Sequence, residues 1–153
     1  MVANATNITW TNYFNTKLRD KIGMNGTCTD LKNLSVYWSN TRSMASFGLL
    51  ISANGKWENT QIVSENFLKE ATNTSQNINN ACGYFWWLNG KSNYHLPQSQ
   101  AQFNGELTPN APADMFVALG KNDQKIYVVP SKKSVIIRME KSAEDSTLIY
   151  GKN

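Results

Sequence analysis

Three short apolar runs near the end of the chain constrain the fold more than any other feature. They occupy residues 116–119, 126–129 and 135–137, and polar connections at 120–124 and 130–134 separate them. Connections this short join neighbouring antiparallel strands. A strand with one face in water alternates apolar and polar residues, whereas continuous apolar runs are typical of a sheet buried on both faces. We therefore expect an antiparallel sheet over 115–139 with both faces covered.

Helices that could cover one face of this sheet precede it. Apolar residues at helical spacing predict helices over 9–22, 41–53 and 64–71. Gly48 lies inside the second helix and costs ~1 kcal/mol relative to alanine, which indicates close packing against another element. We expect the third helix to bury three side chains: Phe67, Leu68 and Ala71.

The pattern changes after residue 80. An aromatic run at 83–88 predicts a strand that ends at the turn signal Asn89-Gly90. An irregular stretch at 91–113 follows, and such a long loop is uncommon in a compact domain unless it is functional. We expect a single domain over 1–153, with 1–80 mainly helical, 81–139 mainly strands, and a polar tail at 140–153.

The second face of the predicted sheet has no evident cover, because the 140–153 tail is polar. Upstream helices are not expected to cover Val117, Leu119 and Val128 together. The chain is therefore expected to be incomplete, or to be a protomer that buries its sheet against a partner.

Composition excludes several classes of function. No apolar run approaches the ~20 residues of a membrane-spanning helix, and the net charge of +4 is not concentrated in a nucleic-acid-binding stripe. One histidine, His95, and two cysteines without Cys-x-x-Cys spacing, Cys28 and Cys82, do not form a metal centre. Whether the cysteines pair stays open. The first seven residues lack the basic start and apolar core of a signal peptide.

Four segments, in order, resemble the β-lactamase-related serine hydrolases, which include class C β-lactamases and D-Ala-D-Ala carboxypeptidases. Residues 38–50 (W-S-N-T-R-S-M-A-S-F-G-L-L) are similar to the family's S-T-A-R-D-M-A-R-F-G-L-L, and 55–65 are similar to G-x-W-x-x-x-x-I-L-S-E. Residues 83–87 (G-Y-F-W-W) are similar to G-Y-L-W-W, and 118–130 are similar to A-x-G-x-x-G-Q-x-I-x-V-x-P. The resemblance implies an α+β, β-lactamase/transpeptidase-like fold with helices packed on an antiparallel sheet. It covers only the C-terminal half of the family's usual domain.

The resemblance also implies a chemistry. Family members cleave amides or esters of small molecules through an acyl-serine intermediate, using a Ser-x-x-Lys motif whose lysine deprotonates the serine. The 153 residues contain no Ser-x-x-Lys, so we expect the chain to be inactive alone and leave open whether it is an enzyme by itself. The resemblance implies no cofactor, and a parent protein that works in the periplasm or is secreted.

Lys121 is the candidate catalytic residue, because it lies where the family's third motif lines the active site. A cation there would orient a substrate carboxylate and stabilise developing negative charge. The alternative is a solvated hairpin lysine, which is how we interpret Lys125 on the same hairpin. Asn122 is a candidate substrate-binding residue of the same motif. Asp123 stands where glycine is common in the family.

Four further residues are candidates for substrate binding. Trp38 and Ser39 precede the second predicted helix, where some family members place pocket residues, although Ser39 or the residue after it can also serve as an N-cap. Tyr84 and Trp86 could present an aromatic wall to a ligand, although core packing is the more common role of such side chains.

Two other classes of function remain as alternatives. One is a non-catalytic module that binds glycan or peptide through the tryptophans and the 91–113 loop. The other is a protomer that depends on assembly and uses the bare sheet face as its interface.

Overall fold

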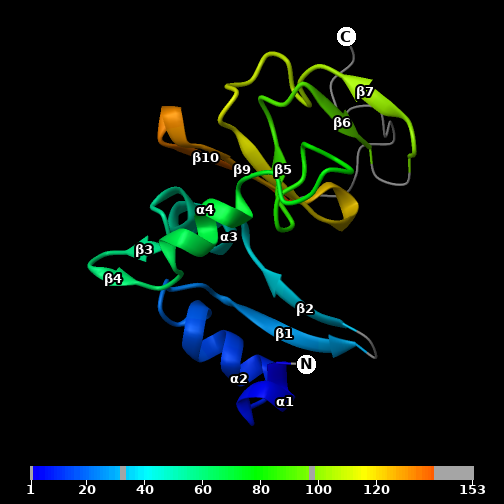
Figure 1. The fold of residues 1–153 in the computed structure, drawn as a ribbon. Coiled ribbons are helices and arrows are strands. Elements are labelled where there is room, and N and C mark those ends of the chain that lie inside the picture. The colour runs from blue at the N-terminus through cyan, green and yellow to red at the C-terminus, as the bar shows by residue number, and fades with distance from the viewer. Residues whose placement is uncertain (1, 32–33, 97–98, 140–153) are drawn as a thin grey trace.

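The computed structural model describes residues 2–31, 34–96 and 99–139, and Figure 1 shows their arrangement. The helices are α1 (Val2–Thr6), α2 (Trp10–Phe14), α3 (Thr41–Ser52) and α4 (Glu65–Ala71), with a π-helical turn η1 (Asn15–Arg19) and the 3-10 turns η2 (Lys121–Asp123) and η3 (Pro130–Lys132). The strands are β1 (Gly26–Leu31), β2 (Leu34–Ser39), β3 (Lys56–Trp57), β4 (Thr60–Gln61), β5 (Trp87–Leu88), β6 (Asn93–His95), β7 (Gln102–Asn104), β8 (Phe116–Leu119), β9 (Lys125–Val129) and β10 (Ser134–Arg138).

The largest sheet contains the three apolar runs of the sequence. Its strand order is β10-β9-β8-β5, and every neighbouring pair is antiparallel. The predicted antiparallel sheet is therefore confirmed. Only the last two residues of the expected 83–88 strand belong to it, because Phe85 has a left-handed backbone (φ 62°) that interrupts the extended conformation.

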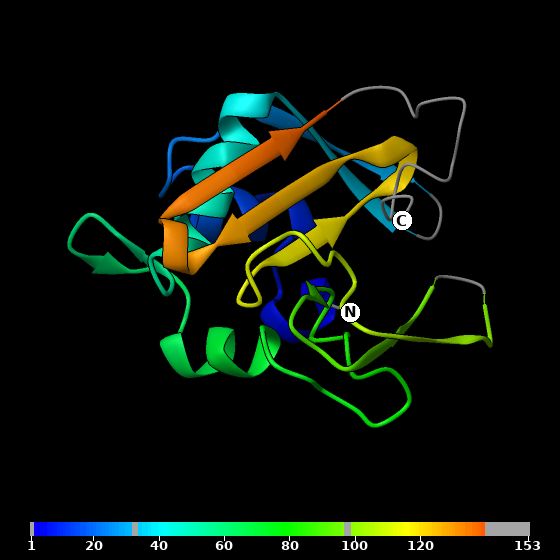
Figure 2. The ribbon, with the colours of Figure 1, turned by 90° about the horizontal axis from the view of Figure 1, so that it is seen from above.

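Helix α3 covers one face of this sheet, across β9 and β10 (Figure 2). The Asn40 side chain caps the helix by accepting a hydrogen bond from the Ser43 backbone N–H at 2.8 Å. A Cβ on Gly48 would lie 2.4 Å from Val135 Cγ1, so only glycine allows the helix to approach β10 this closely. The close packing predicted at Gly48 is confirmed.

Both faces of the sheet bury apolar side chains. Strand register places Val128 in the row that faces α3, and it is fully buried. Val117 and Val129 alternate to the opposite face, yet they are only 3% and 5% exposed. The expectation that this face lacks cover is wrong for Val117. The exposed apolar side chain of the edge strand β10 is Ile136, at 57%.

The first third of the chain is less helical than expected. Thr9 caps α2, and the predicted N-terminal helix continues into η1. A β1–β2 hairpin then follows, which the sequence pattern did not predict. Most of its side chains are exposed, and its only apolar run, at 36–38, lies directly before the predicted second helix.

The third predicted helix, α4, begins after Ser64 as expected and buries Leu68 and Ala71. Phe67 is instead 52% exposed, which corrects the expectation that it is buried. Its ring lies beside Tyr84 on the surface, with the ring centres 6.1 Å apart.

Asn89 organises the loop that follows β5 rather than forming a hairpin turn. Its side chain is almost fully buried and accepts a hydrogen bond from the Thr108 backbone N–H at 2.9 Å. Its amide donates to the Thr108 carbonyl at 3.1 Å and to the Pro112 carbonyl at 3.2 Å. One side chain thus fixes the far end of the 91–113 stretch, which also contains the short β6–β7 hairpin. In the part of the chain that the structure describes, no helix is long and apolar enough to cross a membrane.

Candidate functional site

A pocket of about 260 Å³ lies at the end of the main sheet. It is bounded by β2, by the first turn of α3, by the β8–β9 connection and by the end of β10. The lining is Tyr37, Met44, Ala118, Leu119, Gly120, Gln124, Lys125, Ile126, Ile137, Arg138 and Met139. Most of these side chains are apolar, so the two cations stand out against the rest. We call this cavity the turn pocket.

The β8–β9 connection forms one side of the turn pocket and has an unusual backbone. The Gly120 N–H donates to the Gln124 carbonyl at 2.8 Å and closes the connection. Inside it, Asn122 and Asp123 both adopt left-handed conformations, with φ of 58° and 63°. Such conformations cost non-glycine residues about 1–2 kcal/mol each, although Asn and Asp tolerate them better than most. This geometry explains why glycine would suit position 123.

A buried ion cluster holds Asp123 in this conformation. Its carboxylate lies 2.7 Å from Lys125 Nζ and also pairs with Arg138. The Asp123 and Lys125 side chains are only 4% and 5% exposed, whereas Arg138 is 37% exposed. Lys125 and Arg138 are direct cross-strand neighbours, and like charges placed this way repel unless an anion lies between them.

This cluster corrects the interpretation of Lys125 as a solvated rim lysine. Its side chain is buried, and the Asp123 carboxylate neutralises its ammonium. The sequence pattern did not assign Lys125 or Arg138 to a site. Asp123 is the sequence feature that could have indicated this cluster. It stands where glycine is common in the family, and a carboxylate that becomes buried requires cationic partners.

The opposite side of the turn pocket comes from β2 and the start of α3. The buried Ser43 hydroxyl accepts from the Asn25 N–H at 2.8 Å, and the Ser39 hydroxyl donates to the Asn25 carbonyl at 2.8 Å. Asn40, rather than Ser39, is the N-cap. Both serine hydroxyls therefore bind backbone and fix the chain where β2 leads into α3. Within residues 2–31, 34–96 and 99–139, neither hydroxyl is hydrogen-bonded to a side-chain base of the kind that activates a nucleophile.

Tyr37 was not singled out from the sequence, yet it lines the turn pocket. Its hydroxyl is buried and has no hydrogen-bond partner among the described residues. A Cβ on Gly26 would lie 2.7 Å from this oxygen, so the glycine leaves the space that the phenol occupies. A buried hydroxyl without a partner is costly to the folded state.

The sequence-predicted site residues fall into four places. Lys121 and Asn122 are exposed on the turn, between the pocket-lining Gly120 and Gln124. Trp38 and Ser39 follow the pocket-lining Tyr37, and the Trp38 side chain is 61% exposed. None of these four residues lines the turn pocket itself, although each set adjoins a lining residue in sequence.

Tyr84 and Trp86 lie elsewhere. Trp86 is 7% exposed in the hydrophobic core, edge-on to Phe116 with ring centres 5.1 Å apart. This placement supports the core role and leaves almost none of the indole for a ligand. Tyr84 lines a different pocket, beside α4.

The described residues contain no group of three or more His, Cys, Asp or Glu side chains placed to hold a metal ion. Both cysteines, Cys28 and Cys82, are free thiols. The turn pocket therefore offers an almost wholly apolar wall, because Lys125 is buried against Asp123 and the Tyr37 hydroxyl is closed off from solvent.

Comparisons with known proteins give a result at the level of the fold. No family model matches the sequence, and no curated protein matches it. The solved structure of a "putative 6-aminohexanoate-dimer hydrolase from Bacillus anthracis" aligns with a TM-score of 0.61 and 22% sequence identity. The chain shares the fold of part of that hydrolase. The alignment covers 89% of this chain and 34% of the other, so the chain spans about a third of its neighbour's length.

Proposed function

We propose that this chain forms one wall of the active site of a β-lactamase-related serine hydrolase. In the complete enzyme, a serine and its lysine base come from polypeptide outside these 153 residues. The serine attacks an amide or ester carbonyl, the leaving group departs, and water hydrolyses the acyl-serine. The substrate is a small molecule that reaches the serine beside the turn pocket. The enzyme works in the periplasm or outside the cell.

The observation that carries this proposal is the position of the third-motif turn. Residues 118–130 carry the motif-like sequence, and the fold brings their turn to the same pocket as the start of α3, which carries the first motif-like segment. A fold shared with a β-lactamase-like hydrolase adds support. Two segments that resemble the same family thus meet around one cavity.

Lys121 has a defined role in this proposal. It is exposed on the η2 turn, beside the pocket-lining Gly120, and its ammonium would stabilise negative charge that develops on the substrate. Losing one such preorganised group costs about 10²–10³ in rate. This effect requires the Lys121 ammonium to reach the reacting group of the substrate. Mutation of Lys121 tests whether it does.

The test compares two lysine variants of the enzyme that contains this chain together with the Ser-x-x-Lys polypeptide. Lys121→Ala should lower kcat/KM for a p-nitrophenyl ester by about 10²–10³. The matched control is Lys132→Ala, an exposed lysine at the β9–β10 connection, which should change kcat/KM less than about twofold. Equal and small losses in both variants would show that Lys121 is a solvated hairpin lysine.

A further inference from the structure

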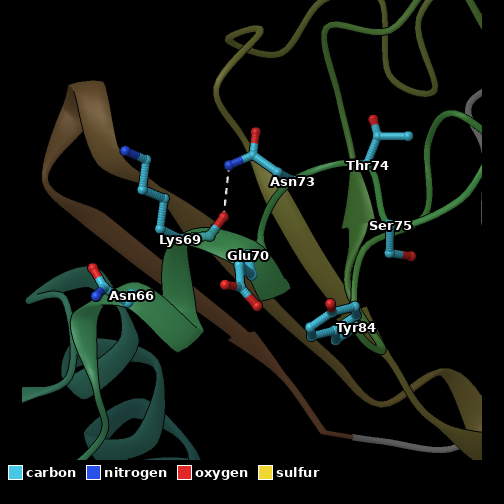
Figure 3. Close-up of a pocket in the computed structure, with 7 residues that line it drawn as sticks. All are labelled: Asn66, Lys69, Glu70, Asn73, Thr74, Ser75 and Tyr84. Carbon is cyan, nitrogen blue, oxygen red and sulfur yellow. Dashed lines mark hydrogen bonds between the residues drawn. The ribbon is translucent and has the colours of Figure 1, made fainter.

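A second pocket lies between α4 and the segment that follows it (Figure 3). Its volume is about 510 Å³, within the range of about 300–1,000 Å³ that is common for small-molecule sites. The lining is Asn66, Lys69, Glu70, Asn73, Thr74, Ser75 and Tyr84, and none of these residues lines the turn pocket. We call this cavity the α4 pocket.

The backbone around the α4 pocket is held by hydrogen bonds. Tyr84 N–H donates to the Ala71 carbonyl at the end of α4, at 2.9 Å. A Cβ on Gly83 would lie 2.1 Å from that carbonyl oxygen, so glycine is needed for the approach. Thr74 Oγ1 donates to the Asn80 carbonyl at 2.7 Å, and Ser75 Oγ donates to the Cys82 carbonyl at 3.1 Å. The walls are thus fixed relative to one another.

Several polar groups of the α4 pocket remain available to a ligand. The side chains of Asn66, Lys69 and Glu70 and the Tyr84 hydroxyl have no hydrogen-bond or ion partner within residues 2–31, 34–96 and 99–139. Asn73 uses its amide N–H to bind the Lys69 carbonyl at 2.6 Å, which leaves its side-chain oxygen as an acceptor. Donors and acceptors therefore occur together in one cavity.

The charges of the α4 pocket balance. Lys69 and Glu70 contribute one positive and one negative charge, and the other lining residues are neutral. This lining does not select an anion such as phosphate, nor a cation. It fits a neutral ligand with many hydroxyl groups, because amides, a carboxylate and an ammonium can each bind a hydroxyl.

An aromatic ring completes the lining. Tyr84 is 44% exposed, and its ring is supported by Phe67 at 6.1 Å between ring centres. Figure 3 shows the Tyr84 side chain and the Glu70 carboxylate on facing sides of the pocket. An exposed aromatic face packs against the C–H face of a sugar ring, while the polar groups around it bind the hydroxyls.

We propose that the α4 pocket binds a neutral carbohydrate chain, with Tyr84 stacking on one sugar ring and Asn66 and Glu70 binding its hydroxyls. The site holds the sugar without reacting with it. This binding goes beyond the proposed hydrolase function and does not depend on it.

The test is titration of the 153-residue chain with chitotetraose, cellotetraose and maltotetraose by isothermal calorimetry. At least one sugar should bind with a Kd of about 1 mM or tighter. Tyr84→Ala should weaken that binding by at least about tenfold, which corresponds to about 1.4 kcal/mol. Tyr84→Phe keeps the ring and should stay within about threefold of the wild type.

Phe85→Ala is the matched control. Phe85 is the next residue, is 98% exposed and does not line the α4 pocket, so its loss should leave Kd unchanged. Thermal unfolding of each variant verifies that the chain remains folded. The proposal is overturned if none of the three sugars shows saturable binding. It is equally overturned if folded Tyr84→Ala binds as tightly as the wild type, or if Phe85→Ala weakens binding as much as Tyr84→Ala does.

Discussion

Replacing Asp123 by asparagine removes a carboxylate that pairs with two cations, Lys125 and Arg138, at the end of the main sheet. Asn keeps the size of the side chain and tolerates the left-handed backbone, so the change isolates the charge. Breaking a buried pair costs about 3–5 kcal/mol, because the remaining charge has lost its partner without regaining water. Arg138 is 37% exposed and can be solvated, whereas Lys125 at 5% cannot. We therefore expect the lower end of the range, about 3 kcal/mol.

Urea unfolding followed by tryptophan fluorescence measures this loss. With a slope of about 2 kcal/mol/M, the midpoint of Asp123→Asn should fall by about 1.5 M at unchanged slope. Asp20→Asn is the matched control, because Asp20 pairs with Arg19 at the same 2.7 Å but is 54% exposed. Exposed pairs contribute about 0–1 kcal/mol, so its midpoint should move by less than about 0.5 M. Similar shifts in both variants would refute the claim that burial makes the Asp123 cluster important.

Three other outcomes follow from the same structure. The 153-residue chain alone should show no turnover of chromogenic cephalosporins or p-nitrophenyl esters above a buffer blank, and activity that survives repurification would contradict the account. Burial raises the pKa of the Cys82 thiol, so less of it is thiolate at pH 7.5. Cys82 should therefore react with Ellman's reagent more slowly than glutathione does, and a faster reaction would contradict this prediction. Strand β10 is an edge strand of the main sheet among the described residues, and its Ile136 is exposed, so the chain should self-associate. Ile136→Lys should increase the monomer fraction in sedimentation experiments. A wild type that is a stable monomer at micromolar concentration would contradict this prediction.

Elements with strong periodic patterns could be predicted from the sequence. Helix α3 spans Thr41–Ser52 against an expected 41–53, because its apolar stripe and its cap agree. The three strands β8, β9 and β10 follow the three apolar runs. Gly48 indicated close packing because a glycine inside a helix is costly unless a neighbour needs the space.

The elements that were missed depend on contacts that the sequence does not display. The β1–β2 hairpin is mostly exposed, so its residues follow no strong apolar pattern. Phe67 has the helical spacing of a buried residue but lies beside Tyr84 on the surface. Lys125 resembles any surface lysine until the fold places Asp123 beside it. Local pattern determines the elements, whereas tertiary neighbours determine which charges are buried and which residues line each pocket.

Covalent trapping tests the central claim of a serine hydrolase most directly. The enzyme that contains this chain is incubated with a fluorophosphonate, and the modified residue is located by mass spectrometry of its peptides. The account predicts one adduct, on the serine of a Ser-x-x-Lys motif outside these 153 residues, and no labelling of that position when the motif's lysine is replaced. An adduct on a serine within these 153 residues, or hydrolysis by an enzyme that acquires no adduct, would contradict it.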